Sequence, residues 1–293
     1  MTQQTTQQTA QGNQAARHIL VLGGTGTTGR RVAARLGALG HTVRIGSRSG
    51  GPAFDWADDT TWGPVLAGID TVYVVPADGE RLTRPFLARA EEAGVVRAVL
   101  LSGRGVDVPE YMGDGNPSGV THIDGDAAIR ETGLEWTVVR PTWFAQNFSE
   151  GFFLDAVRSG ELRLSAGDGA TPFVDAEDIA DVVVAALTGD GHTGRTYELS
   201  GPRALTFAEA AAEITTASGR PVRYTPVDPA EFRAGLVADG WGEEDARWYD
   251  DSLSPLRRNM DAHLSDGVRE ALGRAPRDFT AFVTDAAKAG AWD

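Results

Sequence analysis

Residues 18–29 read HILVL-GGTGTTG, a short, continuously apolar run that ends in a cluster of glycines. Such a run is typical of a buried strand in a parallel sheet. Two overlapping glycine patterns follow it, Gly24-x-Gly26-x-x-Gly29 and Gly23-x-x-Gly26-x-x-Gly29. Between a strand and a helix, these glycines permit a tight turn, close approach of backbone amides to a pyrophosphate and close helix–strand packing. The stretch therefore predicts a dinucleotide-binding turn, with the pyrophosphate at the N-terminus of the following helix.

Strand-like and helical segments alternate from this turn to about residue 141. The first strand is followed by predicted strands at 42–45, 71–75, 95–101 and 136–139, and by predicted helices at 28–39, 84–93 and 123–131. This alternation predicts an α/β fold, a Rossmann-like doubly wound parallel sheet with helices on both faces.

Outside this core the composition changes. Residues 1–16 are mostly Thr, Gln and Ala, and such a stretch has too little apolar surface to offset its ordering entropy, so we expect a disordered tail. Residues 17–150 are expected to form the dinucleotide-binding core. Residues 151–293 are expected to form a smaller, mostly helical C-terminal cap, interleaved with the end of the core, that covers the carboxyl edge of the sheet.

Three local patterns describe the cap further. Helices are predicted at 148–159 and 175–187, and Thr206 and Glu209 have the spacing of a capping box that opens another helix. Six acidic residues between 239 and 251 are expected to lie on a solvated surface.

Composition and charge exclude several classes of function. The 293 residues carry 27 Lys and Arg against 41 Asp and Glu, a net charge of −14. Nucleic acid and anionic membranes are therefore not expected as partners, because phosphate binding needs a basic face. Cysteine is absent, so disulfides and thiolate chemistry are excluded. No apolar run approaches the ~20 residues of a membrane span and no histidines stand at ligand spacing, so we expect a soluble, cytoplasmic protein without a metal site.

The end of the second predicted strand indicates which dinucleotide is bound. NAD-preferring sites place an acidic residue about 20 residues past the glycines, to hold the ribose 2′-hydroxyl. Residues 44–49 read RIGSRS, with no acid. Arg48 can pair with a 2′-phosphate, with Ser47 and Ser49 beside it; the alternative is a solvated loop arginine. We expect NADP(H).

The usual catalytic pair of short-chain dehydrogenases, Tyr-x-x-x-Lys, is missing. Lys288 is the only lysine, and Thr284 stands four positions before it. In the helix where the pair belongs, His122 takes the place of the tyrosine and Asp126 that of the lysine. His122 is a candidate general acid; a packing role is the alternative.

Several motifs carry a family resemblance. Besides the glycine turn, the segments FDW at 54–56, YVVP at 73–76 and LLS at 100–102 resemble the NmrA-like branch of the atypical short-chain dehydrogenases. Others are most similar to the ergot-alkaloid festuclavine and agroclavine dehydrogenases and their bacterial relatives: SRS at 47–49, RPTWF at 140–144 with NFS at 147–149, GDG at 167–169, PFV at 172–174 and APR at 275–277. The segment SGRG at 102–105 departs from this pattern and bears on the pocket's shape.

The resemblance implies an NADPH-dependent reductase of an iminium or a similarly electrophilic double bond. The implied cofactor-binding residues are Gly23, Gly24, Thr25, Gly26, Thr27, Thr28, Gly29, Ser47, Arg48, Ser49, Asp55, Val75, Pro76, Ser102, Pro141 and Thr142. The candidate substrate residues are Tyr73, Tyr111, Trp143, Phe144, Asn147 and Phe173, with His122 as the candidate catalytic residue. For Phe148, Phe152 and Phe153, core packing is the favoured interpretation.

Two classes of function follow. One is an enzyme, monomeric or homodimeric, that transfers hydride to a hydrophobic or cationic small molecule such as an iminium, a quinone or an activated alkene. The other is a non-catalytic NADP(H)-binding redox sensor of the NmrA type. A sugar-nucleotide epimerase is disfavoured by the missing tyrosine and lysine. An open aromatic pocket beside the nicotinamide would favour the enzyme.

Overall fold

The computed structural model describes residues 16–108, 111 and 117–293. The tail expected over residues 1–16 lies outside this part of the chain except for its last residue. At the centre is a six-stranded sheet in the order β2-β1-β3-β4-β5-β8, with every neighbouring pair parallel. Its strands are β1 (His18–Leu22), β2 (Thr42–Gly46), β3 (Thr71–Val74), β4 (Arg97–Leu101), β5 (Glu135–Pro141) and β8 (Arg195–Leu199). The predicted doubly wound α/β fold is confirmed; β8 is a strand that the sequence patterns did not predict.

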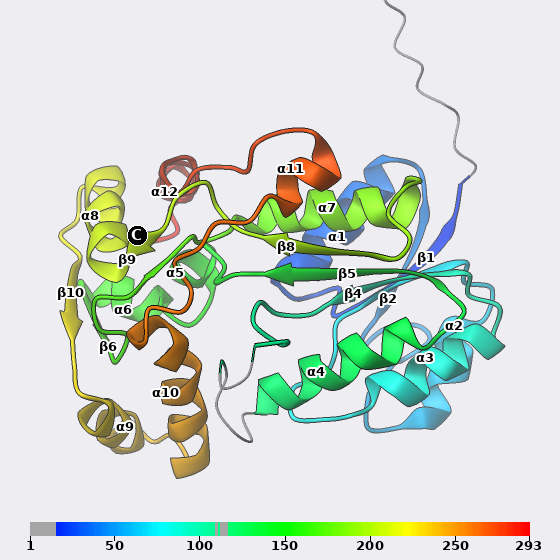
Figure 1. The fold of residues 1–293 in the computed structure, drawn as a ribbon, viewed down its shortest axis with the longest axis horizontal. Helices are drawn as coiled ribbons and strands as arrows, with labels where there is room; N and C mark the ends of the chain where they lie inside the picture. The colour runs from blue at the N-terminus through cyan, green and yellow to red at the C-terminus, as the bar shows by residue number, and fades with distance from the viewer. Residues whose placement is uncertain (1–15, 109–110, 112–116) are drawn as a thin grey trace, which may run out of the picture.

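Helices cover both faces of this sheet (Figure 1). On one face lie α1 (Thr27–Ala38), α7 (Ala176–Thr188) and α11 (Gly267–Leu272). On the other lie α2 (Trp62–Leu66), which follows a 3₁₀ turn at Asp59–Thr61, α3 (Thr83–Glu92) and α4 (Pro117–Arg130). Because both faces are covered, β3 and β4 are buried along their whole length, which explains why every residue after the first in each strand (VYV and AVLL) is apolar or aromatic.

The order of the strands places the binding crevice. From β1 the chain passes to β2 on one side and then to β3 on the other, so the strand order reverses between β1 and β3. In open parallel sheets, ligands bind beyond the carboxyl ends of the strands at such a reversal. The glycine turn after β1 lies at this point.

The cap stands beyond the carboxyl ends, where the arrowhead of β5 points (Figure 1). It contains α5 (Asn147–Glu150), α6 (Leu154–Ser159), β6 (Glu161–Leu164), β7 (Ala170–Thr171), β9 (Leu205–Thr206), α8 (Phe207–Ser218), β10 (Arg223–Pro226), α9 (Pro229–Ala238), α10 (Glu243–Arg257) and α12 (Phe279–Lys288). β6 pairs with β10 and β7 with β9. Between these segments the chain returns to the sheet as α7 and β8, so cap and core alternate along the sequence.

The cap has its own aromatic core. Phe148 makes ring contacts with Phe153, Phe173, Phe207 and Phe279, with centroids 5.0–5.9 Å apart. The predicted capping box is present, since the Glu209 amide donates to the Thr206 hydroxyl and the Thr206 amide donates to Glu209. The single helix predicted over 148–159 is instead two short helices, because the backbone is extended at Gly151.

The acidic stretch of the cap differs from its prediction at one residue. Asp250, on α10, is buried rather than solvated. Its carboxylate accepts hydrogen bonds from Ser165 Oγ at 2.6 Å and from Arg233 and Arg257, each at 2.8 Å. These charge-assisted bonds hold α10 against α9 and the end of β6. In the described part of the chain, no helix is long and apolar enough to cross a membrane.

Candidate cofactor and acceptor site

The turn between β1 and α1 is shaped by its glycines. Gly23 has a φ of +63°, and its carbonyl oxygen accepts from the Gly26 amide at 2.9 Å. A Cβ at Gly29 would lie 2.2 Å from that same carbonyl oxygen, so only glycine allows the helix to pack this close. No side chain caps the N-terminus of α1 and its first turn carries no acid. The helix end is therefore free to receive an anion such as a pyrophosphate.

A cavity of about 680 Å³ opens beside this turn, at the carboxyl ends of β1 and β2. Its lining is Gly23, Thr25, Gly46, Ser47, Arg48, Phe54, Asp55, Trp56, Ala57, Ala77, Glu80 and Leu82. Arg48 is exposed, and in the described part of the chain no ion pair engages its guanidinium. Asp55 holds its own loop, accepting from the Ala57 amide at 3.0 Å and, through its carbonyl, from Trp62 Nε1 at 3.0 Å. The cavity therefore offers the Arg48 cation beside aromatic rings.

Ser102, directly after β4, gives a second sign of a ligand. Its side chain is 3% exposed, and its Oγ has no hydrogen-bond partner among the described residues. A buried hydroxyl without a partner costs about 1–3 kcal/mol, a cost that a polar ligand group can remove. Together with the glycine cradle and Arg48, this orphan hydroxyl fits a dinucleotide lying across the ends of β1, β2 and β4.

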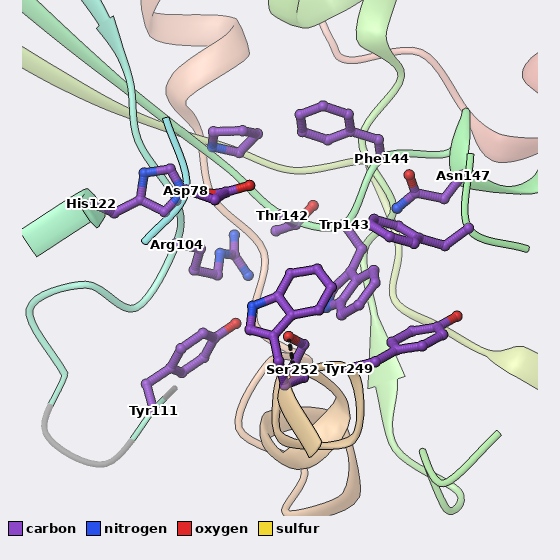
Figure 2. Close-up of a pocket in the computed structure, with 14 residues that line it drawn as sticks. Asp78, Arg104, Tyr111, His122, Thr142, Trp143, Phe144, Asn147, Tyr249 and Ser252 are labelled. Carbon is purple, nitrogen blue, oxygen red and sulfur yellow. Dashed lines mark hydrogen bonds between the residues drawn. The ribbon is translucent and has the colours of Figure 1, made fainter. Parts of the chain in front are cut away.

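A second cavity, of about 320 Å³, lies beyond the ends of β4 and β5. It is lined by Asp78, Gly103, Arg104, Tyr111, His122, Pro141, Thr142, Trp143, Phe144, Asn147, Phe152, Trp248, Tyr249 and Ser252. Figure 2 shows Tyr111, Arg104 and His122 on one side, with Phe144, Asn147 and Tyr249 on the other. Phe, Tyr and Trp rings make up much of the wall, and few polar groups reach the space. This composition suits a flat or hydrophobic small molecule.

His122 stands in the wall of this cavity, against the backbone of Gly103. Burial lowers the pKa of His122, so the imidazole is neutral at pH 7. Its Nδ1 has no hydrogen-bond partner in the described part of the chain. Asp126, one helical turn on, does not support it, because its carboxylate bonds Arg140 at 2.7 Å and Arg130 at 3.0 Å. Asp126 therefore stabilises the fold, and does not replace the missing lysine.

Comparison with known proteins agrees with this geometry. The family model described as NAD(P)H-binding matches residues 23–190, more than half of the chain. The chain belongs to the NmrA-like family of NAD(P)H-binding oxidoreductases. The oxidoreductase YesF of Bacillus subtilis is 32% identical, with 94% of this chain and 96% of YesF covered. The agroclavine dehydrogenase of Claviceps fusiformis is 31% identical, with 91% of this chain and 96% of the relative covered.

The fold is shared with solved structures of lower sequence identity. The triphenylmethane reductase of Citrobacter sp. has a TM-score of 0.74 at 22% identity, with 92% of this chain and 99% of that chain covered. The family resemblance inferred from the sequence motifs is confirmed, including the relation to agroclavine dehydrogenases.

The structure separates the predicted site residues of this NmrA-like protein into groups. Gly23, Thr25, Ser47, Arg48 and Asp55 line the cofactor cavity. The turn and the start of α1 are formed by Gly24, Gly26, Thr27, Thr28 and Gly29. Ser49 is exposed beside Arg48. Val75 and Pro76 follow β3, and the side chain of Val75 lies under Gly23. The cavity beyond β4 and β5, called the acceptor cavity from here on, is lined by Tyr111, His122, Pro141, Thr142, Trp143, Phe144 and Asn147. Of these, Pro141 and Thr142 were expected among the cofactor-binding residues.

The structure places two of the predicted substrate residues away from both cavities. Tyr73 is fully buried in the core under α1, and its hydroxyl donates to Thr28 Oγ1 at 3.0 Å. It therefore holds β3 to the first turn of α1. Phe173 is fully buried in the aromatic core of the cap, against Phe148 and Phe279. The prediction of core packing was wrong for Phe152, which is 52% exposed and lines the acceptor cavity.

Sequence patterns did not identify the cap's side of the acceptor cavity. Trp248, Tyr249 and Ser252 reach it from α10, and Phe152 lies within ring-contact distance of Trp248 and Tyr249, at 6.0 and 5.5 Å. The available signal was an adjacent Trp-Tyr pair, with a serine one turn on, in a helix whose first turn is acidic. Asp78 also lines the cavity without having been predicted, and so does Arg104, whose segment 102–105 was expected to bear on the pocket's shape. Among the described residues no cluster of His, Asp or Glu has the geometry of a metal site.

Proposed function

We propose that this protein is an NADPH-dependent reductase that transfers hydride to an electrophilic small molecule without a Tyr-Lys pair. The acceptor classes are iminium ions or imines, quinones and activated alkenes. The observation that supports this proposal is the open aromatic cavity at the ends of β4 and β5, beside the cofactor crevice. A protein that only sensed the dinucleotide would not need this space.

The preference for NADPH is proposed from Arg48. Its exposed guanidinium lines the cofactor cavity, where a 2′-phosphate can form two parallel hydrogen bonds with it. Ser47, in the same lining, can donate a further hydrogen bond. No acid stands at the end of β2 to favour a free 2′-hydroxyl.

NADPH, when bound, supplies the hydride. The remaining work of the chain is to position the acceptor and to stabilise its charge, which is the ordinary division between cofactor and protein. The faces of Trp143, Phe144 and Trp248 can stabilise a cationic, planar acceptor. An iminium is neutralised by the hydride alone, so its reduction needs no acid from the protein.

Carbonyls and enones also need a proton, which solvent supplies, and His122 is proposed to stabilise the oxygen on which negative charge develops. It lines the acceptor cavity, and its neutral imidazole carries one N–H that can donate a hydrogen bond to this oxygen. Replacing His122 with Phe should therefore remove enone reduction and leave iminium reduction within about 2-fold. Equal loss on both acceptor classes would mean that His122 only packs.

The test is NADPH oxidation, measured anaerobically at several enzyme concentrations against cyclic iminium ions, quinones and enones. Enzyme-dependent oxidation with one class establishes the reductase and identifies the acceptor type. Tight NADPH binding without oxidation across all three classes would favour the redox-sensor alternative.

A further inference from the structure

Arg104 belongs to the segment 102–105 that was expected to bear on the pocket's shape, and the structure shows what its side chain contacts. Its side chain is 2% exposed and reaches from the loop after β4 to the segment between α10 and α11. It donates to the His263 carbonyl at 2.7 Å, to Ser265 Oγ at 3.2 Å and to the Asp261 carbonyl at 3.5 Å. A buried arginine with these partners links two segments that lie more than 150 residues apart.

The carboxylate of Asp261 lies at the centre of this contact. Asp261 is fully buried, and its Oδ1 lies 3.6 Å from Arg104 Nη1. It accepts hydrogen bonds from Tyr111 Oη at 2.9 Å and from Thr171 Oγ1 at 2.6 Å. A buried carboxylate is tolerated only when a cation and hydrogen-bond donors compensate it, and here they do. We call these four residues (Arg104, Tyr111, Thr171 and Asp261) the Asp261 network.

Tyr111 is the member of the network that faces the acceptor, and it is held at three points. Its ring lies over Gly105, where a Cβ would come within 2.3 Å of the ring atoms. Its hydroxyl donates to Asp261, and its carbonyl accepts from Arg258 at 3.1 Å. Because the hydroxyl donates to the buried Asp261 carboxylate, it is not available to protonate an acceptor, and Tyr111 contributes to the cavity as a fixed part of its wall. Burial and the Asp261 charge raise the pKa of Tyr111, which keeps the hydroxyl protonated.

We propose that Tyr111 is a specificity-determining residue for the acceptor, and that Arg104 is a positioning residue that acts on it through Asp261. This inference rests on the proposed reductase function. The fixed ring sets the width of the cavity on the side opposite Phe144 and Asn147. Arg104 makes the network possible by compensating the Asp261 charge.

The first test measures acceptor binding without turnover. Protein loaded with NADP⁺ is titrated with N-methyl-dihydroisoquinolinium, menadione and the larger phenanthrenequinone, and the fluorescence of Trp143 and Trp248 in the cavity wall is followed. Tyr111→Phe frees one end of the ring and should weaken binding of the smaller probes about 5-fold, the equivalent of one hydrogen bond. Tyr111→Ala should shift the preference toward phenanthrenequinone by about 10-fold.

Tyr224→Phe is the matched control. The hydroxyl of Tyr224 likewise donates one hydrogen bond, to the Gly167 carbonyl oxygen at 2.7 Å, but Tyr224 does not line the acceptor cavity. Tyr224→Phe should change the thermal stability without changing the ratio of the affinities for the three probes. If Tyr111→Ala leaves that ratio unchanged, or if the wild type binds none of the three probes, the inference is wrong.

The second test separates positioning from direct contact. Arg104→Met leaves Asp261 buried without its cation, so both stability and probe binding should fall. Arg104→Met combined with Asp261→Asn removes the uncompensated charge, while the amide oxygen introduced by the second substitution still accepts from Tyr111. The double variant should therefore recover most of both losses. If it folds yet binds as weakly as Arg104→Met, Arg104 contacts the acceptor itself and the positioning role is wrong.

Failure of the two proposals can be distinguished. A wild type that never oxidises NADPH, but whose probe preference changes with Tyr111, would contradict the reductase and retain the binding site. A wild type that oxidises NADPH with an acceptor preference unaffected by Tyr111 would retain the reductase and contradict the specificity residue.

Discussion

The two cavities are built in different ways. The cofactor cavity begins at a turn of consecutive residues, 23–29, whose backbone forms the cradle, and it needs glycine where a Cβ would collide. The acceptor cavity is built from side chains, which come from the loop after β4, from α4, from the segment after β5 and from α10. A site formed by the backbone tolerates few substitutions, whereas the side chains that line a cavity can be substituted one by one. We therefore expect the family to keep its cofactor while its acceptors vary.

The largest expected effect lies in the glycine turn. A Cβ at Gly26 would lie 3.3 Å from the Gly23 carbonyl oxygen, a contact that a small shift relieves, so Gly26→Val should still fold. The added methyl groups would project from the start of α1 toward the pyrophosphate, and NADPH affinity should fall by at least about 100-fold. Isothermal titration calorimetry measures it, with a thermal melt to check the fold.

Gly29→Ala is the contrasting variant for the same turn. Its Cβ would lie 2.2 Å from a backbone oxygen, which cannot move aside cheaply, so it should lower the melting temperature as well as NADPH binding. If the folded Gly26→Val variant still bound NADPH, the cofactor would have to lie elsewhere. The contrast between a cofactor cavity built from backbone and an acceptor cavity built from side chains would then be wrong.

A smaller effect is expected from the one side chain on which the cofactor preference depends. Arg48→Ala removes the cation that is available to a 2′-phosphate, and should weaken NADPH about 30-fold while changing NADH less than about 2-fold. Arg89→Ala, an exposed arginine on α3 paired with Glu92, is the control. Equal weakening of both cofactors would show that Arg48 does not contact a 2′-phosphate.

The same contrast explains what the sequence could and could not predict. The glycine turn and the buried strands follow from spacing and apolar runs, which are local, and the structure confirms them. The presence of helices on both faces of the sheet followed from the alternation of strand-like and helical segments. Arg48 and Trp143 line the cavities for which they were predicted, and each lies within four residues of the end of a predicted strand, where the carboxyl ends meet at one edge. Asn147 was named from the family resemblance and also lines the acceptor cavity.

The errors fall where tertiary packing decides. Tyr73 lies within β3 and Phe173 follows β7, and nothing in their spacing shows that the first faces α1 and the second the core of the cap. Phe152 is exposed whereas its neighbour Phe153 is fully buried, and adjacent identical residues give a sequence pattern no means of telling which ring turns inward. The burial of Asp250 could not be predicted from the sequence, because its partners Ser165, Arg233 and Arg257 lie in three separate segments.

A moderate effect is expected in the acceptor cavity itself. Trp248→Ala removes one ring from the α10 wall and should raise the acceptor KM about 10-fold, while NADPH affinity stays within about 2-fold. Trp136→Ala is the control, because Trp136 lies under Arg130 at the other end of β5. A change in NADPH affinity as large as that in KM would mean that the two cavities are energetically one site.

The smallest expected effect is the pH dependence of stability that His122 contributes. Burial lowers its pKa in the folded protein, so below the ordinary value of about 6.5 the unfolded chain takes up a proton that the folded chain resists. The stability that neutral His122 allows is therefore present above that pH and is lost as the pH falls. His122→Phe should lose less melting temperature than the wild type between about pH 8 and pH 5. His41 and His192, whose pKa values burial also lowers, are present in both proteins, so their contributions cancel. An equal fall in melting temperature in the two proteins would mean that water reaches His122 in the acceptor cavity. The acceptor cavity would then be more hydrated, and so more like the cofactor cavity, than its aromatic lining indicates.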